Sequence, residues 1–456
     1  MRRRLVWIGG ALAAVAVLAA AGVYIAYKNG AFRSTDTERG ETLSTTEPDL
    51  PAPKKPRAER AKASWPFFRF DFRRDGVNPG ARARPPFNVA WSKRVPRSGY
   101  LEAPAVVDEG VIVYASYGKR FGSDLFARDA MTGRRLWHKH YRNGSNFAGS
   151  AGIFRGRVYI TSHDGNIRCY GLRSGKIKFR KKIAAAESPP IGAGNLVYFG
   201  DGPKGGNGRF RAINWRTGRT RWSYKASGTI SSGAALTATT AYFASYGGSV
   251  YALNRFTGKL RWKTTVRGAR NNLVPFYSTP ALARGRLIVG GTDGSIYALD
   301  PRDGSQRWRY DGNGYVYGSA AIWHGRVFMG DFGGGFHAIS LKSGRRLWKR
   351  NIGPIIGSAT VMRGLVYISS LRPPRTYAFD ARTGRQVWSF GDGQFSPLIA
   401  DGKQVWLTGK AHVYRLAERE SKAARRAKAR RKARAKARAK AKAAQAKRKA
   451  KANSSP

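Results

Sequence analysis

The sequence is poor in cysteine and in acidic residues. Its 456 residues include one cysteine, Cys169, and 26 Asp and Glu against 84 Lys and Arg. A single thiol excludes an internal disulfide and any site built on two neighbouring cysteines. Nothing near Cys169 in the sequence would lower the pKa of its thiol, which favours a small buried residue over a nucleophile. The formal net charge of +58 exceeds anything that solubility requires.

The scarcity of acidic residues also argues against a metal site. A hard divalent cation needs several oxygen ligands, usually carboxylates. The candidates Asp201, Asp293 and Asp331 each lie in an Asp-Gly or Gly-Asp turn, where aspartate is common for local reasons. His138 and His140 share one face of a strand, but a third ligand is not evident. We therefore predict neither a resident metal nor a cofactor.

Long apolar runs are also scarce, and the one present lies near the N-terminus. Residues 5–27 are uncharged and follow Arg2–Arg4. As a helix they would span ~34 Å, enough for the ~30 Å core of a bilayer. The basic residues favour a signal-anchor with the N-terminus inside and the remainder extracytoplasmic. A cleaved signal peptide is the alternative, because Ala19–Ala21 offers small residues to a protease. Residues 1–27 are thus assigned as cytoplasmic start and transmembrane anchor.

Two segments of contrasting composition follow the apolar run. Residues 28–64 carry Ser, Thr, Pro and mixed charges with few apolar residues, which predicts a disordered tether. Residues 65–85 begin with five aromatic residues among the first eight. Because so much aromatic surface is costly to leave in water, we expect this aromatic leader to pack on the domain that follows.

That domain is built from seven copies of one short phrase, best seen at residues 378–388. The phrase predicts a strand, a turn capped by Asp380 and closed by Gly384, and a return strand that contains Trp388. The turn glycines stand at positions 133, 175, 218, 258, 304, 344 and 384. A period near ~40 residues with four short strands per unit is typical of a β-propeller.

An eighth unit is divided between the two ends of the repeat region. Three more strands are predicted after the last phrase, ending at Leu416, and the missing fourth strand is available at residues 86–91. We therefore predict an all-β, eight-bladed propeller over residues 86–416 with a split closing blade. Pairing the ends removes two exposed sheet edges. We expect Val89 and Trp91 to be buried in this blade.

The phrase Ala-x-Asp-x-x-Thr-Gly-x-x-x-Trp at residues 378–388 resembles the repeat of the PQQ (pyrroloquinoline quinone) repeat family. The resemblance covers roughly residues 86–416, and Trp65-Pro66 with Gly76 resembles the leader found before such propellers. It implies a fold in which Ala and Trp dock neighbouring blades. The family includes quinone-dependent dehydrogenases and non-catalytic members such as the outer-membrane assembly propeller. Its alcohol dehydrogenases carry an adjacent cysteine pair, which this chain lacks, so we predict no enzyme activity.

The longest repeat step, 46 residues, enlarges the loop that spans residues 267–277. Together with the neighbouring loop at residues 313–317, it offers a polar or anionic ligand, such as a glycan or peptide, a binding surface at one mouth of the channel. The alternative is a set of loops that only closes over the channel. The candidate ligand-binding residues are Arg270, Asn271, Asn272, Phe276, Tyr277, Tyr315 and Tyr317.

The C-terminal tail, residues 417–456, has 17 basic and two acidic residues. Like charges four residues apart oppose its alanine-driven helix propensity, which predicts disorder in isolation. Capture of polyanions is one interpretation, and a solvated solubility segment is the other. The candidate binding residues are Arg425, Arg426, Lys428, Arg430, Arg431, Lys432, Arg434, Lys436, Arg438, Lys440 and Lys442.

Taken together, these features predict a non-catalytic, membrane-anchored, extracytoplasmic propeller. It would act as a binding scaffold for envelope proteins or for anionic cell-surface polymers or lipids. A PQQ-dependent dehydrogenase is one alternative. A protein that binds nucleic acid through the basic tail is the other.

Overall fold

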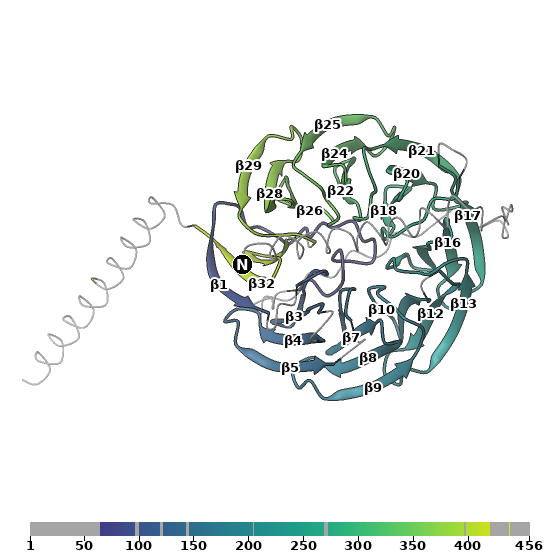
Figure 1. Cartoon of the computed structure of the whole chain (residues 1–456), viewed down its shortest axis with the longest axis horizontal. Coiled ribbons are helices and arrows are strands. Elements are labelled where there is room, and N and C mark those ends of the chain that lie inside the picture. The colour runs from purple at the N-terminus through teal and green to yellow at the C-terminus, as the bar shows by residue number, and fades with distance from the viewer. Residues whose placement is uncertain are drawn as a thin grey trace, which may run out of the picture. The chain divides into compact units, whose positions relative to one another are not determined.

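The computed structural model describes residues 64–95, 100–118, 122–142, 146–203, 205–268, 272–395 and 398–419, and the single residue 437. Within these ranges the chain forms eight four-stranded antiparallel sheets arranged as a propeller (Figure 1). The predicted all-β, eight-bladed architecture is confirmed. No helix in the described ranges is long and apolar enough to cross a membrane. The predicted anchor, tether and basic tail lie almost wholly outside these ranges.

Each blade has four strands, ordered from the axis outward. Blade 1 holds β2 (Val106–Asp108), β3 (Val111–Ala115), β4 (Ser123–Asp129) and β5 (Arg135–Tyr141). Blade 2 holds β6 (Gly152–Phe154), β7 (Arg157–Ser162), β8 (Asn166–Gly171) and β9 (Ile177–Lys182). Blade 3 holds β10 (Ile191–Ala193), β11 (Leu196–Asp201), β12 (Gly208–Asn214) and β13 (Thr220–Ala226). Blade 4 holds β14 (Ala235–Leu236), β15 (Thr240–Ala244), β16 (Ser249–Asn254) and β17 (Leu260–Thr265).

The second half of the ring repeats this plan. Blade 5 holds β18 (Ala281–Ala283), β19 (Arg286–Gly290), β20 (Ser295–Leu299) and β21 (Gln306–Asp311). Blade 6 holds β22 (Ala321–Trp323), β23 (Arg326–Gly330), β24 (Gly335–Ser340) and β25 (Arg346–Asn351). Blade 7 holds β26 (Thr360–Met362), β27 (Leu365–Leu371), β28 (Pro374–Asp380) and β29 (Gln386–Phe390). Blade 8 holds β30 (Ile399–Asp401), β31 (Gln404–Thr408), β32 (His412–Glu418) and β1 (Phe87–Arg94).

The repeated phrase forms the third strand, the turn and the outer strand of a blade. In blade 7 the Asp380 carboxylate accepts hydrogen bonds from the backbone N–H of Thr383 at 2.8 Å and of Arg382 at 3.0 Å. Gly384 closes the turn with a φ of 70°, a conformation that favours glycine. Ala378 stands opposite Trp388 across the two strands, and a bulge follows this pair. The alanine leaves room for the large tryptophan ring.

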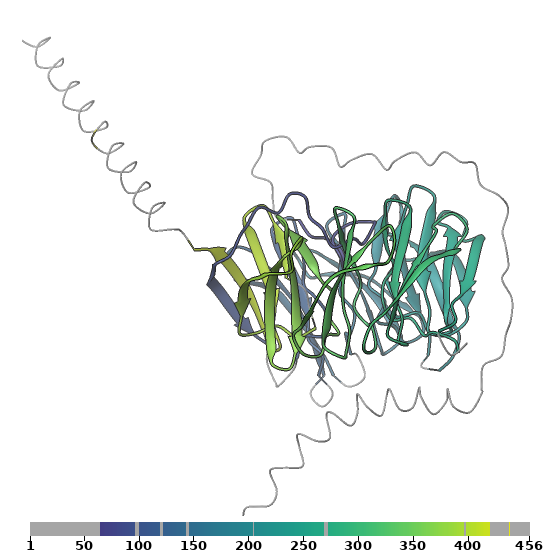
Figure 2. The ribbon, with the colours of Figure 1, turned by 90° about the horizontal axis from the view of Figure 1, so that it is seen from above.

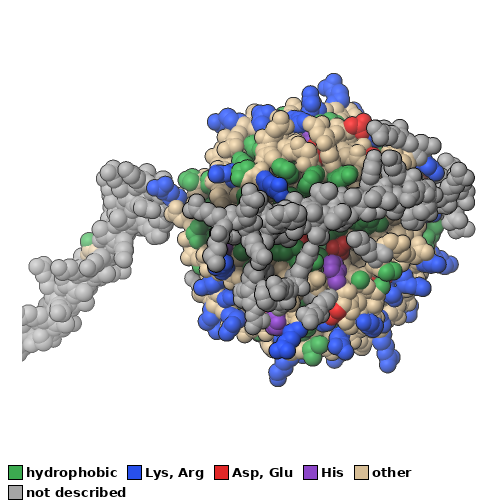
Figure 3. Space-filling model, viewed as in Figure 1, with side chains coloured by type: hydrophobic (Ala, Val, Ile, Leu, Met, Phe, Trp, Pro, Cys, Tyr) green, Lys and Arg blue, Asp and Glu red, His purple; other side chains and the backbone are tan. Residues whose placement is uncertain are grey.

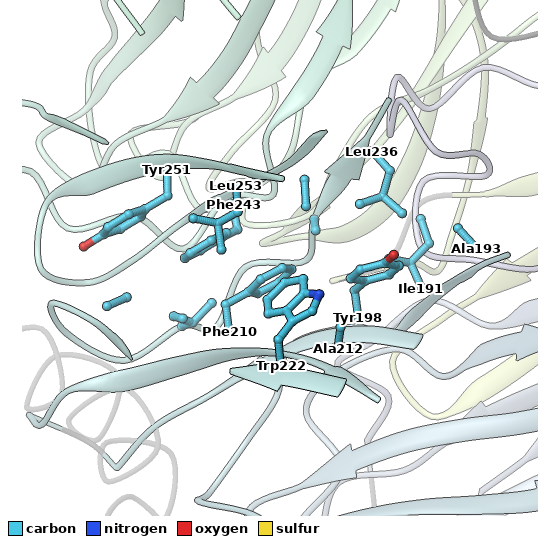
Figure 4. Packing of buried hydrophobic residues seen from close by; sticks show 14 of the residues in the cluster. Ile191, Ala193, Tyr198, Phe210, Ala212, Trp222, Leu236, Phe243, Tyr251 and Leu253 are labelled. Atoms are coloured by element: carbon cyan, nitrogen blue, oxygen red, sulfur yellow. The ribbon is translucent and has the colours of Figure 1, made fainter. Parts of the chain in front are cut away.

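Neighbouring blades are joined where a tryptophan covers the turn glycine of the next blade. Trp222 donates its indole N–H to the Arg255 carbonyl at 3.0 Å, and a Cβ added at Gly258 would lie 2.7 Å from the Trp222 ring. Around Trp222, the rings of Tyr198 and Phe210 fill the space between blades 3 and 4 (Figure 4). The same glycine contact recurs in the pairs Trp91–Gly133, Trp137–Gly175, Phe179–Gly218, Trp262–Gly304, Trp308–Gly344 and Trp348–Gly384.

Blade 8 is built from both ends of the propeller sequence, because β1 pairs antiparallel with β32 from Phe87↔Glu418 to Arg94↔His412. Trp91 joins this blade to blade 1 by donating to the Met131 carbonyl at 3.1 Å. The expectation that Val89 is buried is wrong, since its exposed fraction is 48%. The register shifts between Val89 and Trp91, so a bulge breaks their two-residue alternation and places them on opposite faces.

The aromatic leader lies along one end of the propeller (Figure 2, purple). Backbone hydrogen bonds join it to six inner strands, through Val107, Ile153, Leu236, Leu282, Ile322 and Val361. Arg69 and Arg74 are fully buried, and their guanidinium groups donate to the carbonyls of Ala320 and Ala234 respectively, at 2.6 and 2.8 Å. Burial lowers the pKa of both arginines to about 9. The leader thus fills one end of the axis.

The blade contact gives a first prediction. Gly258→Ala should lower the free energy of unfolding by about 2 kcal/mol or more. The positive φ is strained for alanine, and the new Cβ also collides with the Trp222 ring. Gly285→Ala is the matched control, since its φ is also positive at 67° but no atom lies within 4 Å of the added Cβ. It should cost only about 1 kcal/mol. Urea unfolding measures both, and equal losses would refute the role of the tryptophan.

The bulge gives a second prediction. Trp91→Asp should destabilise the propeller by about 2 kcal/mol or more, because it removes the contact that joins blade 8 to blade 1 and places a charge there. Val89→Asp should change the stability by less than about 0.5 kcal/mol, because this side chain is exposed. Thermal unfolding of the two variants compares the sites directly. A propeller that tolerates Trp91→Asp would contradict the closure described here.

Candidate functional site

The candidate site is the mouth of the axis where the chain enters each inner strand. In every blade, one equivalent position lies four residues before the first residue of the inner strand. In six blades this position lies five residues before the strand residue that is hydrogen-bonded to the leader. We call these eight positions the axial ring. In blade order they hold Glu102, Ala148, Glu187, Ser231, Tyr277, Tyr317, Ile356 and Phe395. The axial ring contains two carboxylates and no lysine or arginine.

A second set of loops, between the second and third strands of seven blades, is tied to the same mouth. The backbone N–H of one residue in each loop, or of the last strand residue before it in blade 7, donates to the carbonyl that lies six residues before the inner strand of that blade. We call these seven positions the tied loops. The donors are Tyr117, His163, Gly202, Tyr246, Thr292, Phe332 and Leu371. These bonds hold each loop beside the axial ring.

The Glu187 carboxylate, in blade 3, is contacted by side chains from three other blades. Its carboxylate accepts a hydrogen bond from the Ser231 hydroxyl at 2.6 Å and another from the Tyr277 hydroxyl at 2.9 Å. His163 contributes an ion-pair contact of 3.6 Å from Nε2 to Oε2 of Glu187. The side chain of Glu187 keeps an exposed fraction of 21%. One half-buried carboxylate therefore joins blades 2, 3, 4 and 5 at the axis.

The electrostatic effects at this mouth follow from the same contacts. Burial alone would raise the pKa of Glu187, but the interactions with His163, Ser231 and Tyr277 hold it below its usual value. The Glu187 carboxylate in turn raises the pKa of His163. Burial, followed by the charge of Glu187, raises the pKa of Tyr246 and Tyr277 well above 10. These tyrosines therefore stay neutral donors beside a charged carboxylate.

Aromatic rings surround the two carboxylates. The Tyr277 ring lies 6.1 Å from that of Tyr246 and 5.9 Å from that of Tyr317, both in edge-to-face arrangements. Tyr100 lies 5.1 Å from Tyr117, and burial together with Glu102 raises the pKa of both. Figure 3 shows many Lys and Arg side chains around the outer edge of this face of the propeller.

The structure brings together three of the residues that the sequence singled out. Tyr277, Tyr315 and Tyr317 form a continuous row, with 5.8 Å between the rings of Tyr315 and Tyr317. Asn272 is half-buried. Phe276 has no exposed surface and packs against Tyr297 in the core. Arg270, Asn271 and all eleven candidate residues of the basic tail lie outside the described residues.

The acidic and histidine residues of the mouth were not found from the sequence. Glu102, Glu187, His163 and Tyr246 come from four different loops, and each loop by itself has no recognisable motif. A signal was available, because the residue four positions before each inner strand could be compared across the repeats. That comparison places Glu102 and Glu187 at equivalent positions.

The described residues do not fit the quinone and calcium that the resemblance implies. Cys169 is buried in β8, and burial raises the pKa of its thiol to about 11. The carboxylates of Asp201 and Asp331 are taken by Arg211 at 2.8 Å and His337 at 2.6 Å. In the part of the chain that the structure describes, no group of three His, Cys, Asp or Glu could hold a metal. A tricarboxylic quinone would also meet the acidic axial ring.

Comparison with known proteins places the chain in a family. The family model described as "Outer membrane protein assembly factor BamB" matches residues 122–273 and 206–427. The chain belongs to this family of PQQ-type propellers. Its relatives include an outer membrane protein assembly factor BamB of Burkholderia pseudomallei, 30% identical over 121 residues, which are 26% of this chain and 29% of the relative. A serine/threonine-protein kinase AfsK of Streptomyces griseus is 29% identical over 166 residues, 34% of this chain and 20% of the kinase.

Solved structures share the fold at low sequence identity. BamB from Moraxella catarrhalis superposes with a TM-score of 0.60 at 15% identity and covers 73% of this chain and 99% of its own. A quinohemoprotein alcohol dehydrogenase from Pseudomonas putida HK5 reaches a TM-score of 0.68 at 13% identity, over 80% and 82% of the two chains. The chain thus spans less than a third of the two sequence relatives, and the structural likeness concerns the fold alone.

The contact between His163 and Glu187 gives a third prediction. In the full chain, NMR titration should find the His163 pKa above its ordinary value of 6.5, and Glu187→Gln should lower it. Because the folded pKa is raised, this pair stabilises the fold below pH 6.5, and the contribution is lost as pH rises through the folded pKa. Glu109→Gln, at a turn between β2 and β3, is the control and should leave His163 unchanged. If the His163 pKa is the same in the Glu187→Gln variant as in the parent, the pair does not form.

Proposed function

We propose that the chain is a non-catalytic scaffold at the cell envelope, which binds protein partners at the axial mouth of its propeller. The observation that carries this proposal is the side-chain network at the mouth. Ser231, Tyr277 and His163 are all directed at Glu187, and the axial ring has no basic residue to receive an anionic cofactor. A mouth lined by half-buried tyrosines suits contact with a polypeptide, because tyrosine combines a large apolar surface with a polar group.

The family supports the envelope location and the scaffold role. The matched family and one relative are outer membrane protein assembly factors by name, which indicates assembly with other envelope proteins. Because the chain spans only part of its curated relatives, we transfer to it the general role and no particular partner. Residues 1–27 would anchor the chain in a membrane and leave the propeller extracytoplasmic, as the basic residues before the apolar run favour.

The basic tail would add a second mode of attachment. Its 17 basic residues would bind anionic lipids or cell-surface polymers, at ~1 kcal/mol for each basic residue near an anionic bilayer. Nucleic acid would suit the same charges, but a propeller outside the cytoplasm would not meet the chromosome. The tail and the axial mouth are therefore proposed as separate sites with ligands of different chemistry.

A quinone-dependent dehydrogenase is the second candidate, favoured by the likeness to the alcohol dehydrogenase structure. Two observations oppose it. The lone cysteine is buried and cannot form the adjacent cysteine pair of such enzymes. Of the three acids considered for calcium, Asp201 and Asp331 pair with arginine and histidine, and Asp293 accepts hydrogen bonds from Ser295 and Tyr297. The scaffold function explains the mouth without a cofactor.

Site-specific photo-crosslinking in intact cells tests the proposed function, with a benzophenone side chain placed in the full chain. At position 317, in the axial ring, it should give a discrete adduct with an envelope protein. At position 109, in the turn between β2 and β3, the same group should give at least about fivefold less of that adduct. Adducts with nucleic acid, or equal adducts from both positions, would refute a protein scaffold that acts through its mouth.

A further inference from the structure

The axial mouth departs sharply from the charge of the whole chain. The eight axial ring positions and the seven tied-loop positions include Glu102, Glu187 and His163 but no lysine or arginine. The chain as a whole has 84 Lys and Arg among 456 residues. These fifteen positions therefore hold two carboxylates and no basic residue, although Arg267, Arg372 and Lys410 lie elsewhere in the loops of the same blades.

The Glu187 carboxylate retains the capacity to bind a further donor. A carboxylate offers about four lone-pair directions. Ser231 contacts one oxygen of Glu187, and Tyr277 and His163 both contact the other, so three directions are used. The Glu187 side chain is 21% exposed, which leaves its remaining direction accessible to a ligand. Glu102, at the equivalent position of blade 1, adds a second negative charge beside Tyr100 and Tyr117.

The tyrosines provide the other half of a cation site. Tyr246, Tyr277 and Tyr317 are half-buried and stand edge to face, so ring faces and ring edges alternate around the mouth. A ring face attracts a guanidinium or ammonium group within about 6 Å of its centre, and a nearby carboxylate supplies the counter-charge. An anion would meet the same ring faces and two carboxylates, and both would repel it.

We propose that the axial mouth binds a guanidinium or primary ammonium group carried by a polypeptide. Glu187 and Glu102 are the counter-ions, and the rings of Tyr246, Tyr277 and Tyr317 provide the aromatic surface. This inference names the ligand chemistry of the proposed scaffold function and so rests on it. At physiological ionic strength, exposed charges more than about 8 Å from the two carboxylates are largely screened.

Two polypeptides could supply the cation: an Arg or Lys of a partner, and the chain's own residues 420–456. Both carry the same chemistry, and the experiment separates them. The probe is a fluorescent peptide with the sequence of residues 421–440, and the control peptide has glutamine in place of every Lys and Arg. Binding to the full chain is measured by fluorescence anisotropy at physiological salt.

The expected result is saturable binding of the basic peptide and none of the glutamine peptide. Glu102→Gln/Glu187→Gln should weaken binding about tenfold, because both counter-ions lose their charge while the hydrogen-bond geometry is retained. Glu109→Gln/Glu418→Gln is the matched control. It raises the net charge of the chain equally at positions outside the axial ring and should leave the affinity unchanged.

A second pair of variants tests the aromatic surface and guards against misfolding. Tyr317→Ala should weaken peptide binding about threefold or more, and Tyr317→Phe should bind like the parent, because the ring face is retained. Each variant should keep the parent's melting temperature within a few degrees. If the glutamine double variant is unfolded, the comparison of these two Tyr317 variants still decides the question.

A different pattern of results is expected if the chain's own residues 420–456 supply the cation. If residues 420–456 already occupy the mouth, added peptide will not bind. A benzophenone at position 317 will then crosslink to that segment of the same chain. Changing Glu102 and Glu187 to glutamine should abolish this internal crosslink. Either pattern supports the cation site. The proposal is overturned if neither peptide binding nor the internal crosslink depends on the two glutamates. Peptide binding without an envelope-protein adduct would instead leave the cation site standing and refute the proposed scaffold function.

Discussion

The contact between a tryptophan on one outer strand and the turn glycine of the next blade is the constraint on which the structure depends. Each such glycine has a positive φ and no Cβ, so the neighbouring ring can lie directly against its backbone. Because the contact recurs from Trp91 on Gly133 to Trp348 on Gly384, it sets the spacing of the blades. The closed ring in turn gathers eight short loops around one axis.

In the same architecture, basic side chains are frequent on the outer strands, and the two ends of the axis differ in charge. Every outer strand except β29 carries at least two Lys or Arg residues, which discourages edge-to-edge association of exposed strands. At the axis the two ends differ. The leader fills one end with Arg69 and Arg74, whose donors are taken largely by backbone carbonyls. The opposite mouth carries Glu102 and Glu187 among tyrosines.

The fold could be predicted from the sequence because its determinants are local and repeated. The seven turn glycines mark seven blades, Asp380 caps the clearest of these turns, and the orphan Trp91 marks the closing strand of the eighth blade. Val89 was mispredicted because a bulge breaks the two-residue alternation and leaves no signal within the strand itself. Glu187 was missed because its partners lie up to 90 residues away and meet it only when blades 2 to 5 pack around the axis.

We propose the axial mouth as a binding site that takes no quinone cofactor. Substrate-dependent dye reduction by the full chain, supplied with pyrroloquinoline quinone and calcium, tests this claim most directly. The account predicts that the rate with alcohols or aldoses equals that of the free quinone, for the parent and for Glu187→Gln alike. A saturable, quinone-dependent rate that Glu187→Gln abolishes would contradict it.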